Sequence, residues 1–275
     1  MRNKSWLIAI VVFAFYACSN GAKKSNKSDK AKPEETHEEE YIPKIKTGVA
    51  SVTLGVGENE EDSKICYSYY ELTDKSLLYE ENVNKLLGES ITIEQEEPEE
   101  KAKETKLSHK HFLSILKDFK RDFDKYSDTD YPWTYFDSCS IDESYKAFVQ
   151  VFNGSYSYTG GAHGNSYEGY YLFSKETGEQ LRVKDLVTDT KKLNKIADKY
   201  FRQSNQLSAT DNLEEAGFWF TKGFELNDNF YFEKGKLIFI YNQYEIGPYA
   251  MGIIYVEIPI SEIKSILKVD LDRTK

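Results

Sequence analysis

Three runs rich in tyrosine and phenylalanine constrain the fold more than any other feature of the sequence. They are Y-P-W-T-Y-F-D-S-C-S (131–140), Y-K-A-F-V-Q-V-F-N-G-S-Y-S-Y (145–158) and S-Y-E-G-Y-Y-L-F-S (166–174). Aromatic and β-branched residues favour strands, and only short segments separate the runs. We therefore predict successive strands of an antiparallel sheet.

The rest of the C-terminal half alternates between strand and helix patterns. E-T-G-E (176–179) is a reverse turn, and L-R-V-K-D-L-V (181–187) begins a short strand that leads into a helix around 191–203. A hairpin follows at 229–242, with Lys234 and Gly235 at its turn. We expect a last strand over 251–259 and a closing helix over 261–267.

The N-terminal half predicts a smaller unit. Residues 45–56 alternate in polarity and residues 64–72 are rich in aromatics, so we expect two antiparallel strands. Leucines and one valine over 77–88, and phenylalanines over 108–123, recur at helical spacing. The fold class is therefore α+β, with a small strand-helix domain over 45–126 and a larger antiparallel sheet domain with flanking helices over 131–268.

The N-terminus has the layout of a bacterial export signal. Arg2 and Lys4 precede an unbroken apolar run over 6–17, which is shorter than the roughly 20 residues that a membrane-spanning helix needs. Ala17 before Cys18 is typical of lipoproteins, in which the cysteine is lipidated and becomes the mature N-terminus, although Phe15 stands where leucine is usual.

We accordingly predict a signal peptide over 1–17 and acyl chains on Cys18 that hold the protein on a membrane. Residues 18–43 are almost free of apolar side chains and form a flexible tether. The protein is then an exported, membrane-anchored lipoprotein of the periplasm or cell surface. A cleaved signal with an incidental Cys18 is the alternative.

Charge and cysteine content exclude several classes of protein. Without Arg2 and Lys4, the 36 basic residues become 34 against 46 acidic ones, a net charge of about −12. Such an acidic chain is a poor candidate for binding nucleic acid, whereas its charge would attract a cationic partner. The alternative is that the acidity only keeps the protein soluble. Cys66 and Cys139 are too few for a disulfide framework or structural zinc site, which leaves two buried thiols or one long-range disulfide.

The run Y-T-G-G-A-H-G (158–164) holds three glycines and one of the four histidines. A strand follows it, whereas a phosphate-binding loop leads into a helix, so we expect no nucleotide cofactor. The glycines supply positive φ for a connecting loop. His163 has no partner motif for catalysis or metal binding, so we expect no catalytic residue and no metal site. We expect instead a binding loop that contains Tyr158, Gly160, Gly161, His163 and Asn165.

A second run, Y-N-Q-Y-E-I-G-P-Y-A-M-G (241–252), predicts a projecting turn. Gly247 and Pro248 interrupt a pair of strands there and display Tyr244, Glu245 and Tyr249. Exposed tyrosines on a rigid turn suit sugar stacking or protein recognition. Packing of these tyrosines against a sheet face is the alternative.

These two runs, together with G-E-Q-L-R-V-K-D-L-V and V-E-I-P, resemble the C-terminal domain of unknown function shared by the anti-sigma factor RsiV and the peptidoglycan deacetylase PdaC. Residues 45–126 resemble, more weakly, the small domain that precedes it in those proteins. Deacetylation needs a separate metal-binding domain that is missing here, and only five residues precede the apolar run, so neither deacetylase nor anti-sigma activity is expected.

The resemblance implies binding, because RsiV-like proteins sense lysozyme by binding it. We expect a lipid-anchored, non-catalytic envelope protein that recognises lysozyme or cell-wall glycan through the two loops. Pro248 is among the expected binding residues of the second loop. A glycan hydrolase or transferase that uses His163 with Glu245 or Glu168 is the alternative from another class. A structural lipoprotein without a soluble ligand is a third.

Overall fold

The computed structural model describes residues 45–53, 64–89, 121, 125, 134–158 and 161–274, and these belong to one compact unit, Ile42–Lys275. For 45–53, 64–70, 88 and 89 it describes the backbone only. The predicted signal, tether and Cys18 lie outside the described residues. So do Gly160 and most of the helix predicted over 108–123. No helix among the described residues is long and apolar enough to cross a membrane.

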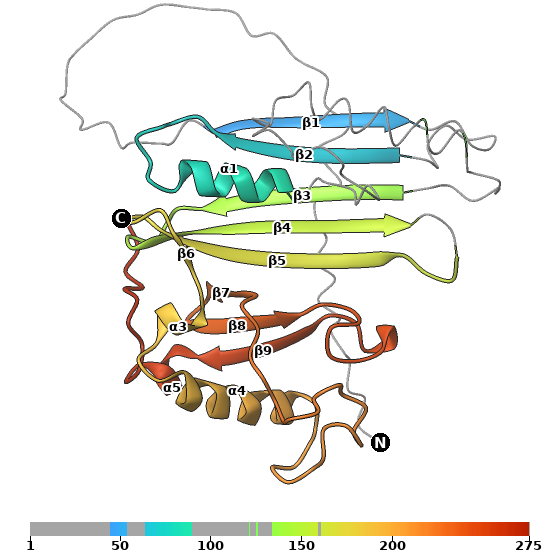
Figure 1. Ribbon diagram of the computed structural model, residues 1–275, viewed down its shortest axis with the longest axis vertical. Helices are drawn as coiled ribbons and strands as arrows, with labels where there is room; N and C mark the ends of the chain where they lie inside the picture. Colours follow the sequence, from blue (N-terminus) through green and yellow to red (C-terminus); the bar gives the residue numbers. More distant parts are fainter. Residues whose placement is uncertain are drawn as a thin grey trace, which may run out of the picture. The chain divides into compact units, whose positions relative to one another are not determined.

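The larger sheet contains the aromatic strands. Its six strands lie in the order of the chain, and all neighbours are antiparallel except β2 and β3 (Figure 1). The strands are β1 (Ile45–Thr53), β2 (Lys64–Leu72), β3 (Thr134–Asp142), β4 (Phe148–Tyr158), β5 (Asn165–Ser174) and β6 (Gln180–Leu181). The three predicted aromatic strands and the predicted antiparallel pair β1–β2 are confirmed.

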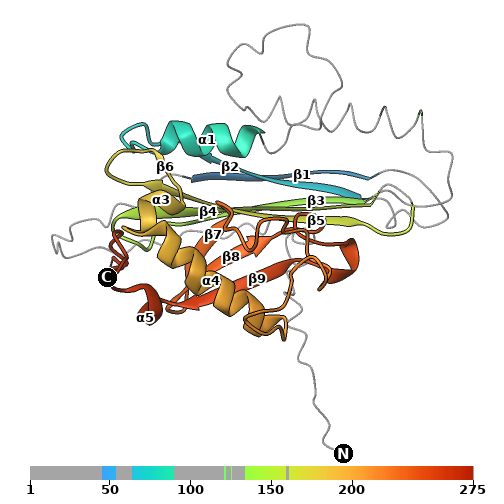
Figure 2. The same ribbon diagram turned by 60° about the horizontal axis from the view of Figure 1, so that its bottom comes forward.

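The two predicted domains contribute to this one sheet. β2 pairs in parallel with β3, through Ile65 with Tyr135 and Cys66 with Phe136. Helix α1 (Glu80–Glu89) lies over one face of the sheet, where Val83 and Leu87 pack with Val149 and neighbouring apolar residues (Figure 2). The α+β class is confirmed, and a domain boundary between 126 and 131 stays a prediction.

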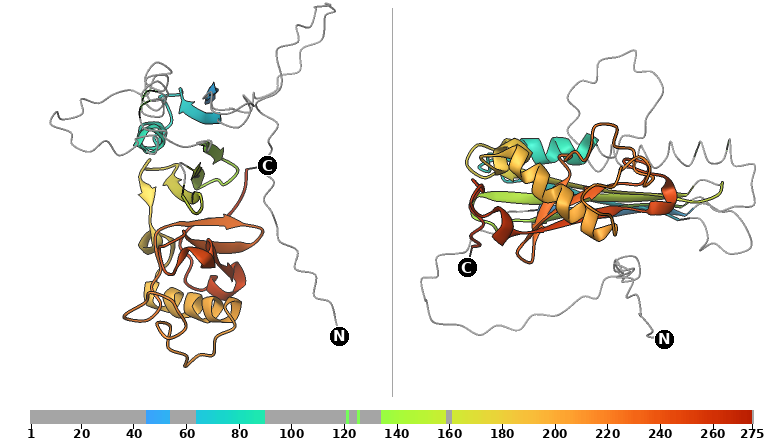
Figure 3. Two further views of the ribbon diagram at one scale, coloured as in Figure 1. Left: turned by 90° about the vertical axis from the view of Figure 1, so that its right-hand side faces the viewer. Right: turned by 90° about the horizontal axis from the view of Figure 1, so that it is seen from below.

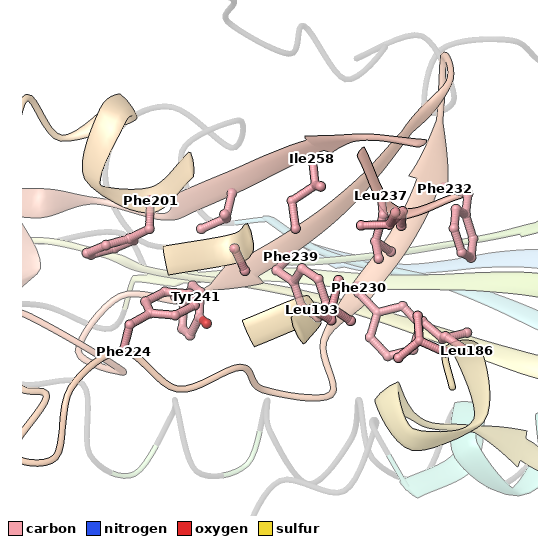
Figure 4. Packing of buried hydrophobic residues seen from close by; sticks show 14 of the residues in the cluster. Leu186, Leu193, Phe201, Phe224, Phe230, Phe232, Leu237, Phe239, Tyr241 and Ile258 are labelled. Carbon is pink, nitrogen blue, oxygen red and sulfur yellow. The ribbon is translucent and has the colours of Figure 1, made fainter. Parts of the chain in front are cut away.

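The smaller sheet carries the main core. Its antiparallel strands are β7 (Phe230–Glu233), β8 (Lys236–Tyr241) and β9 (Ile254–Pro259), and α4 (Thr190–Ser204) lies along it (Figure 3). Alternate apolar residues of the strands face the helix, as Figure 4 shows for Leu237, Phe239 and Ile258. The turn of the predicted hairpin is at Lys234 and Gly235, which both have positive φ, as a two-residue type I′ turn requires.

Helix α4 follows from local chemistry. The Asp189 side chain accepts a hydrogen bond of 2.8 Å from the backbone N of Lys192 and so caps the first turn. Leu193, Ala197 and Phe201 recur every four residues and are fully buried. Short helix α3 (Val183–Leu186) precedes α4, and the last strand leads into α5 (Ile260–Ile263).

Two predictions about the chain's details need correction or completion. The closing helix predicted over 261–267 ends at Ile263, because Leu267 forms a β-bridge with Val187 and the backbone N of Lys268 bonds to Leu186 O at 2.7 Å. Cys139 is a free buried thiol and forms no disulfide with Cys66, and the burial of Cys66 stays a prediction.

Side-chain amides connect the two sheets. Gln150 of β4 accepts from the backbone N of Phe232 at 2.6 Å and donates to Phe232 O at 3.1 Å, as a neighbouring strand would. At the edge of β5, Asn242 accepts from the backbone N of Glu168 and Asn229 accepts from that of Tyr170, both at 2.8 Å. These amides hold the loops of the smaller sheet against β5.

Candidate functional site

The loop between β4 and β5 is closed by its own tyrosine. Tyr158 donates a hydrogen bond of 3.1 Å to Gly161 O. Gly161 has φ of +95°, as predicted for a connecting loop. Gly164 was predicted to supply positive φ, but its role is a different one. A Cβ there would lie 2.4 Å from Tyr156 Oη, so glycine is needed for the close approach of that ring.

The loop between β8 and β9 turns at Tyr244, which has φ of +64°. Glu245 fixes the turn, because its two carboxylate oxygens accept hydrogen bonds from Asn227 Nδ2 at 2.7 Å and from the backbone N of Asn242 at 2.8 Å. Pro248 is exposed and precedes a 3-10 helix, η1 (Tyr249–Met251). The predicted turn is present, with Tyr244 and Glu245 exposed.

The two loops meet through aromatic rings. The His163 imidazole stacks on the Tyr249 ring, with centroids 3.5 Å apart and planes at 14°. Tyr244 lies beside both, with its centroid 6.4 Å from that of His163 and 5.7 Å from that of Tyr249. Tyr249 is therefore half-buried rather than displayed, which corrects that part of the prediction.

Hydrogen bonds fix the orientation of the stacked rings. Gly164 O accepts from Tyr249 Oη at 2.8 Å and from His163 Nδ1 at 3.1 Å. Because a carbonyl only accepts, Nδ1 carries the proton in the neutral imidazole, and Nε2 accepts from Tyr244 Oη at 3.3 Å. We call Tyr156, His163, Tyr244 and Tyr249 the aromatic tip; the two loops that carry it are at the same end of their sheets (Figure 1).

Asn165 is not brought into the aromatic tip. It is the exposed first residue of β5 and pairs with Ser157 across the hairpin. In the part of the chain that the structure describes, its side chain makes no hydrogen bond with the tip residues.

The carboxylates considered as catalytic partners of His163 are engaged elsewhere. Both oxygens of Glu245 hold the turn, and Glu168 Oε2 accepts from Tyr255 Oη at 2.8 Å. Burial raises the pKa of the Glu168 carboxyl, and the Tyr255 hydrogen bond offsets part of this rise. Among the described residues, neither glutamate is hydrogen-bonded or ion-paired to His163.

The described residues hold no group of three histidine, cysteine or acidic side chains placed to bind a metal ion. The tip instead offers ring faces and hydroxyls. Among its tyrosines, Tyr244 is the most exposed, with 51% of the residue's full surface accessible, followed by Tyr156 at 39%.

Sequence reasoning missed three residues that support the tip. Tyr156 was assigned only to a strand, although its ring lies over Gly164. Met251 packs closely against Gly247 and Gly217, which connects the turn to a third loop. In that loop the backbone N of Trp219 donates to Ile246 O at 2.9 Å, and the Trp219 side chain is 53% exposed. The run G-F-W-F carried a usable signal, since exposed Trp219 lies between buried Phe218 and Phe220.

Comparison with known proteins finds a family model that matches part of the chain. Residues 184–261 match the family model described as a protein of unknown function (DUF3298). This region contains α4, the smaller sheet and the loop with Tyr244 and Tyr249, whereas His163 lies outside it. A comparison with curated proteins found no match.

Two solved structures of DUF3298 family proteins are similar to this chain. The one from Bacteroides fragilis is 18% identical with a TM-score of 0.59, over 82% of this chain and 95% of that chain. The one from Pseudomonas aeruginosa is 16% identical with a TM-score of 0.57, over 86% of this chain and 99% of that chain. Residues 184–261 thus match the DUF3298 family model, and the chain shares its fold with these two DUF3298 family proteins.

Proposed function

We propose that the protein is a lipid-anchored, non-catalytic binding protein of the cell envelope that holds its ligand against the aromatic tip. The N-terminal sequence supports the anchor, with acyl chains on Cys18 and residues 18–43 as the tether. The resemblance to RsiV and PdaC supports an envelope ligand, either lysozyme or cell-wall glycan.

One observation carries this proposal: His163 and Tyr244 are 81 positions apart in the chain, and the fold brings them into contact. Two further contacts lock the two loops: the stack of His163 on Tyr249 and the hydrogen bond from Tyr249 Oη to Gly164 O. A ligand that binds to rings already held in place loses less conformational freedom on binding. The rigidity of the tip therefore favours recognition.

The contacts of His163 favour binding over catalysis. A general base needs a free ring nitrogen within hydrogen-bond reach of the substrate. Both nitrogens of His163 face groups of the protein, Gly164 O and Tyr244 Oη. The hydrolase or transferase alternative would require the Tyr244 hydroxyl to move away from Nε2.

Calorimetric titration of the full-length chain with lysozyme and with peptidoglycan fragments tests the proposal. We expect saturable binding of at least one ligand, weakened by about tenfold or more in the double variant His163→Ala, Tyr244→Asn. Tyr167→Ala is the matched control, because this tyrosine is also exposed but projects from the opposite face of β5 to Ser166 and Glu168. Unchanged affinity in the double variant would remove the site assignment, and no binding of either ligand would remove the function.

A further inference from the structure

We propose that the aromatic tip binds uncharged sugar rings, so that the ligand is the glycan of the envelope and not a cationic protein. This inference rests on the proposed function and names the ligand class of the same site. It follows from the charges of the two loops, the geometry of the exposed rings and the hydrogen-bonding groups around them.

The two loops are almost free of charge in a highly charged chain. Aspartate, glutamate, lysine and arginine make up 30% of the sequence, but only Glu245 among the 19 residues of 158–165 and 242–252. Glu245 is also committed internally, through Asn227 and the backbone N of Asn242. A surface that recognises a cationic protein places several carboxylates where they face the partner, whereas these two loops carry only Glu245, whose oxygens already hold the turn.

The rings of the tip differ in what they offer a ligand. Tyr249 is covered by His163, whereas the Tyr244 ring is tilted at 42° to Tyr249 and half exposed. Tyr244 is also held by its hydroxyl contact with His163 Nε2 and by the turn that Glu245 fixes. A fixed, open aromatic face packs against the apolar C–H face of a sugar ring.

Uncharged polar groups surround these rings. Within the described residues, the Tyr156 hydroxyl and Gln243 Nε2 have no hydrogen-bond partner, while Gln243 Oε1 accepts from the backbone N of Ser166 at 3.0 Å. That bond fixes the amide plane and leaves its NH₂ group free to donate. Hydroxyls and amides match the hydroxyl and acetamido groups of cell-wall sugars.

The test is titration of the full-length chain with a hexamer of β-1,4-linked N-acetylglucosamine, with peptidoglycan fragments and with lysozyme, at about 50 and 500 mM salt. We expect both sugar ligands to bind, with dissociation constants that differ less than about twofold between the two salt concentrations, because screening acts on charges. Tyr244→Phe keeps the ring but loses the hydroxyl contact with His163, so it should weaken sugar binding less than removal of the ring does.

Tyr244→Asn removes the ring and should weaken sugar binding by about tenfold or more; asparagine is chosen because it tolerates positive φ. Tyr167→Ala should leave sugar binding unchanged. Binding of lysozyme alone, lost at high salt, would overturn the sugar assignment and leave the proposed function standing. Sugar binding unaffected by Tyr244→Asn would overturn the assignment to the tip, and no binding of any of the three ligands would overturn both proposals.

Discussion

The imidazole of His163 lies flat on the ring of Tyr249, 3.5 Å between centroids, and both side chains bond to the same carbonyl, Gly164 O. This contact joins the β4–β5 loop to a loop within residues 184–261, the region that matches the DUF3298 family model, although His163 lies outside that region. The aromatic tip is therefore shared between the two sheets.

Removing the imidazole should loosen the tip without unfolding the protein. His163→Ala loses the stack and two hydrogen bonds, so we expect about 1 kcal/mol less unfolding free energy, because the site is partly exposed. His163→Phe keeps the stack and should recover part of that loss. Urea denaturation of the three proteins measures the difference; equal stabilities of the alanine variant and the unmodified chain would contradict the stacking role.

Gly178, in the turn after β5, should be far less replaceable than a glycine in open space. It has φ of +76°, and a Cβ there would lie 2.1 Å from the backbone oxygen of Leu78. We expect Gly178→Ala to cost roughly 3 kcal/mol or more. Gly223→Ala is the matched control, since Gly223 has φ of +90° but no atom within 4 Å of its Cβ position; it should cost about 1 kcal/mol. Thermal denaturation measures the stability of both variants. Similar losses of stability in the two would argue against the close approach of Gly178 to Leu78.

Gln150 should be needed to hold the two sheets together. Gln150→Ala leaves the buried backbone N of Phe232 without this acceptor, so we expect a loss of about 2 kcal/mol. Gln203→Ala, on the exposed side of α4, should change stability by less than about 0.5 kcal/mol. Chemical denaturation monitored by tryptophan fluorescence compares them. A Gln150 variant as stable as the control would mean that apolar packing alone joins the sheets.

Asp137 should make stability fall as pH rises. Burial raises its pKa to about 7 in the folded chain, against about 3.9 unfolded. Between these values the folded chain binds more protons than the unfolded chain, so the free energy of unfolding decreases from about pH 4 to pH 7 and levels off above.

The side chain in Asp137→Asn cannot ionise, so its unfolding free energy should not fall in this way. Between pH 5 and pH 8 the unmodified chain should lose on the order of 2 kcal/mol more unfolding free energy than this variant does. Glu168→Gln is a useful second variant, because the raised pKa of Glu168 acts in the same direction. Denaturation curves at several pH values test this. A pH profile that is the same with and without Asp137 would show that its carboxyl is not titrating differently on folding.

The elements were predictable from sequence, whereas their contacts were not. Runs of aromatics gave β3, β4 and β5, and an alternating run gave β1, because strand signals are local. The two loops were identified by their glycines, prolines and tyrosines. Their meeting could not be predicted, because it depends on Gln150, Asn229 and Asn242, polar residues that make long-range contacts without any periodic pattern.

Individual side chains at the site were predicted less well for a related reason. Tyr244 and Tyr249 looked equivalent in the sequence, since both are tyrosines beside a turn. Only the stack with His163 covers Tyr249 and leaves Tyr244 as the open ring. Gly164 likewise looked like a turn residue, and its role depends on the ring of Tyr156 two positions before the hairpin loop.

Amide hydrogen exchange of the full-length chain, with and without saturating peptidoglycan fragments, shows whether the ligand binds at the aromatic tip. We expect slower exchange on binding in both loops of the tip, around His163 and around Tyr244, and no change in α4. Protection confined to other segments, with both loops exchanging as in the free protein, would contradict it.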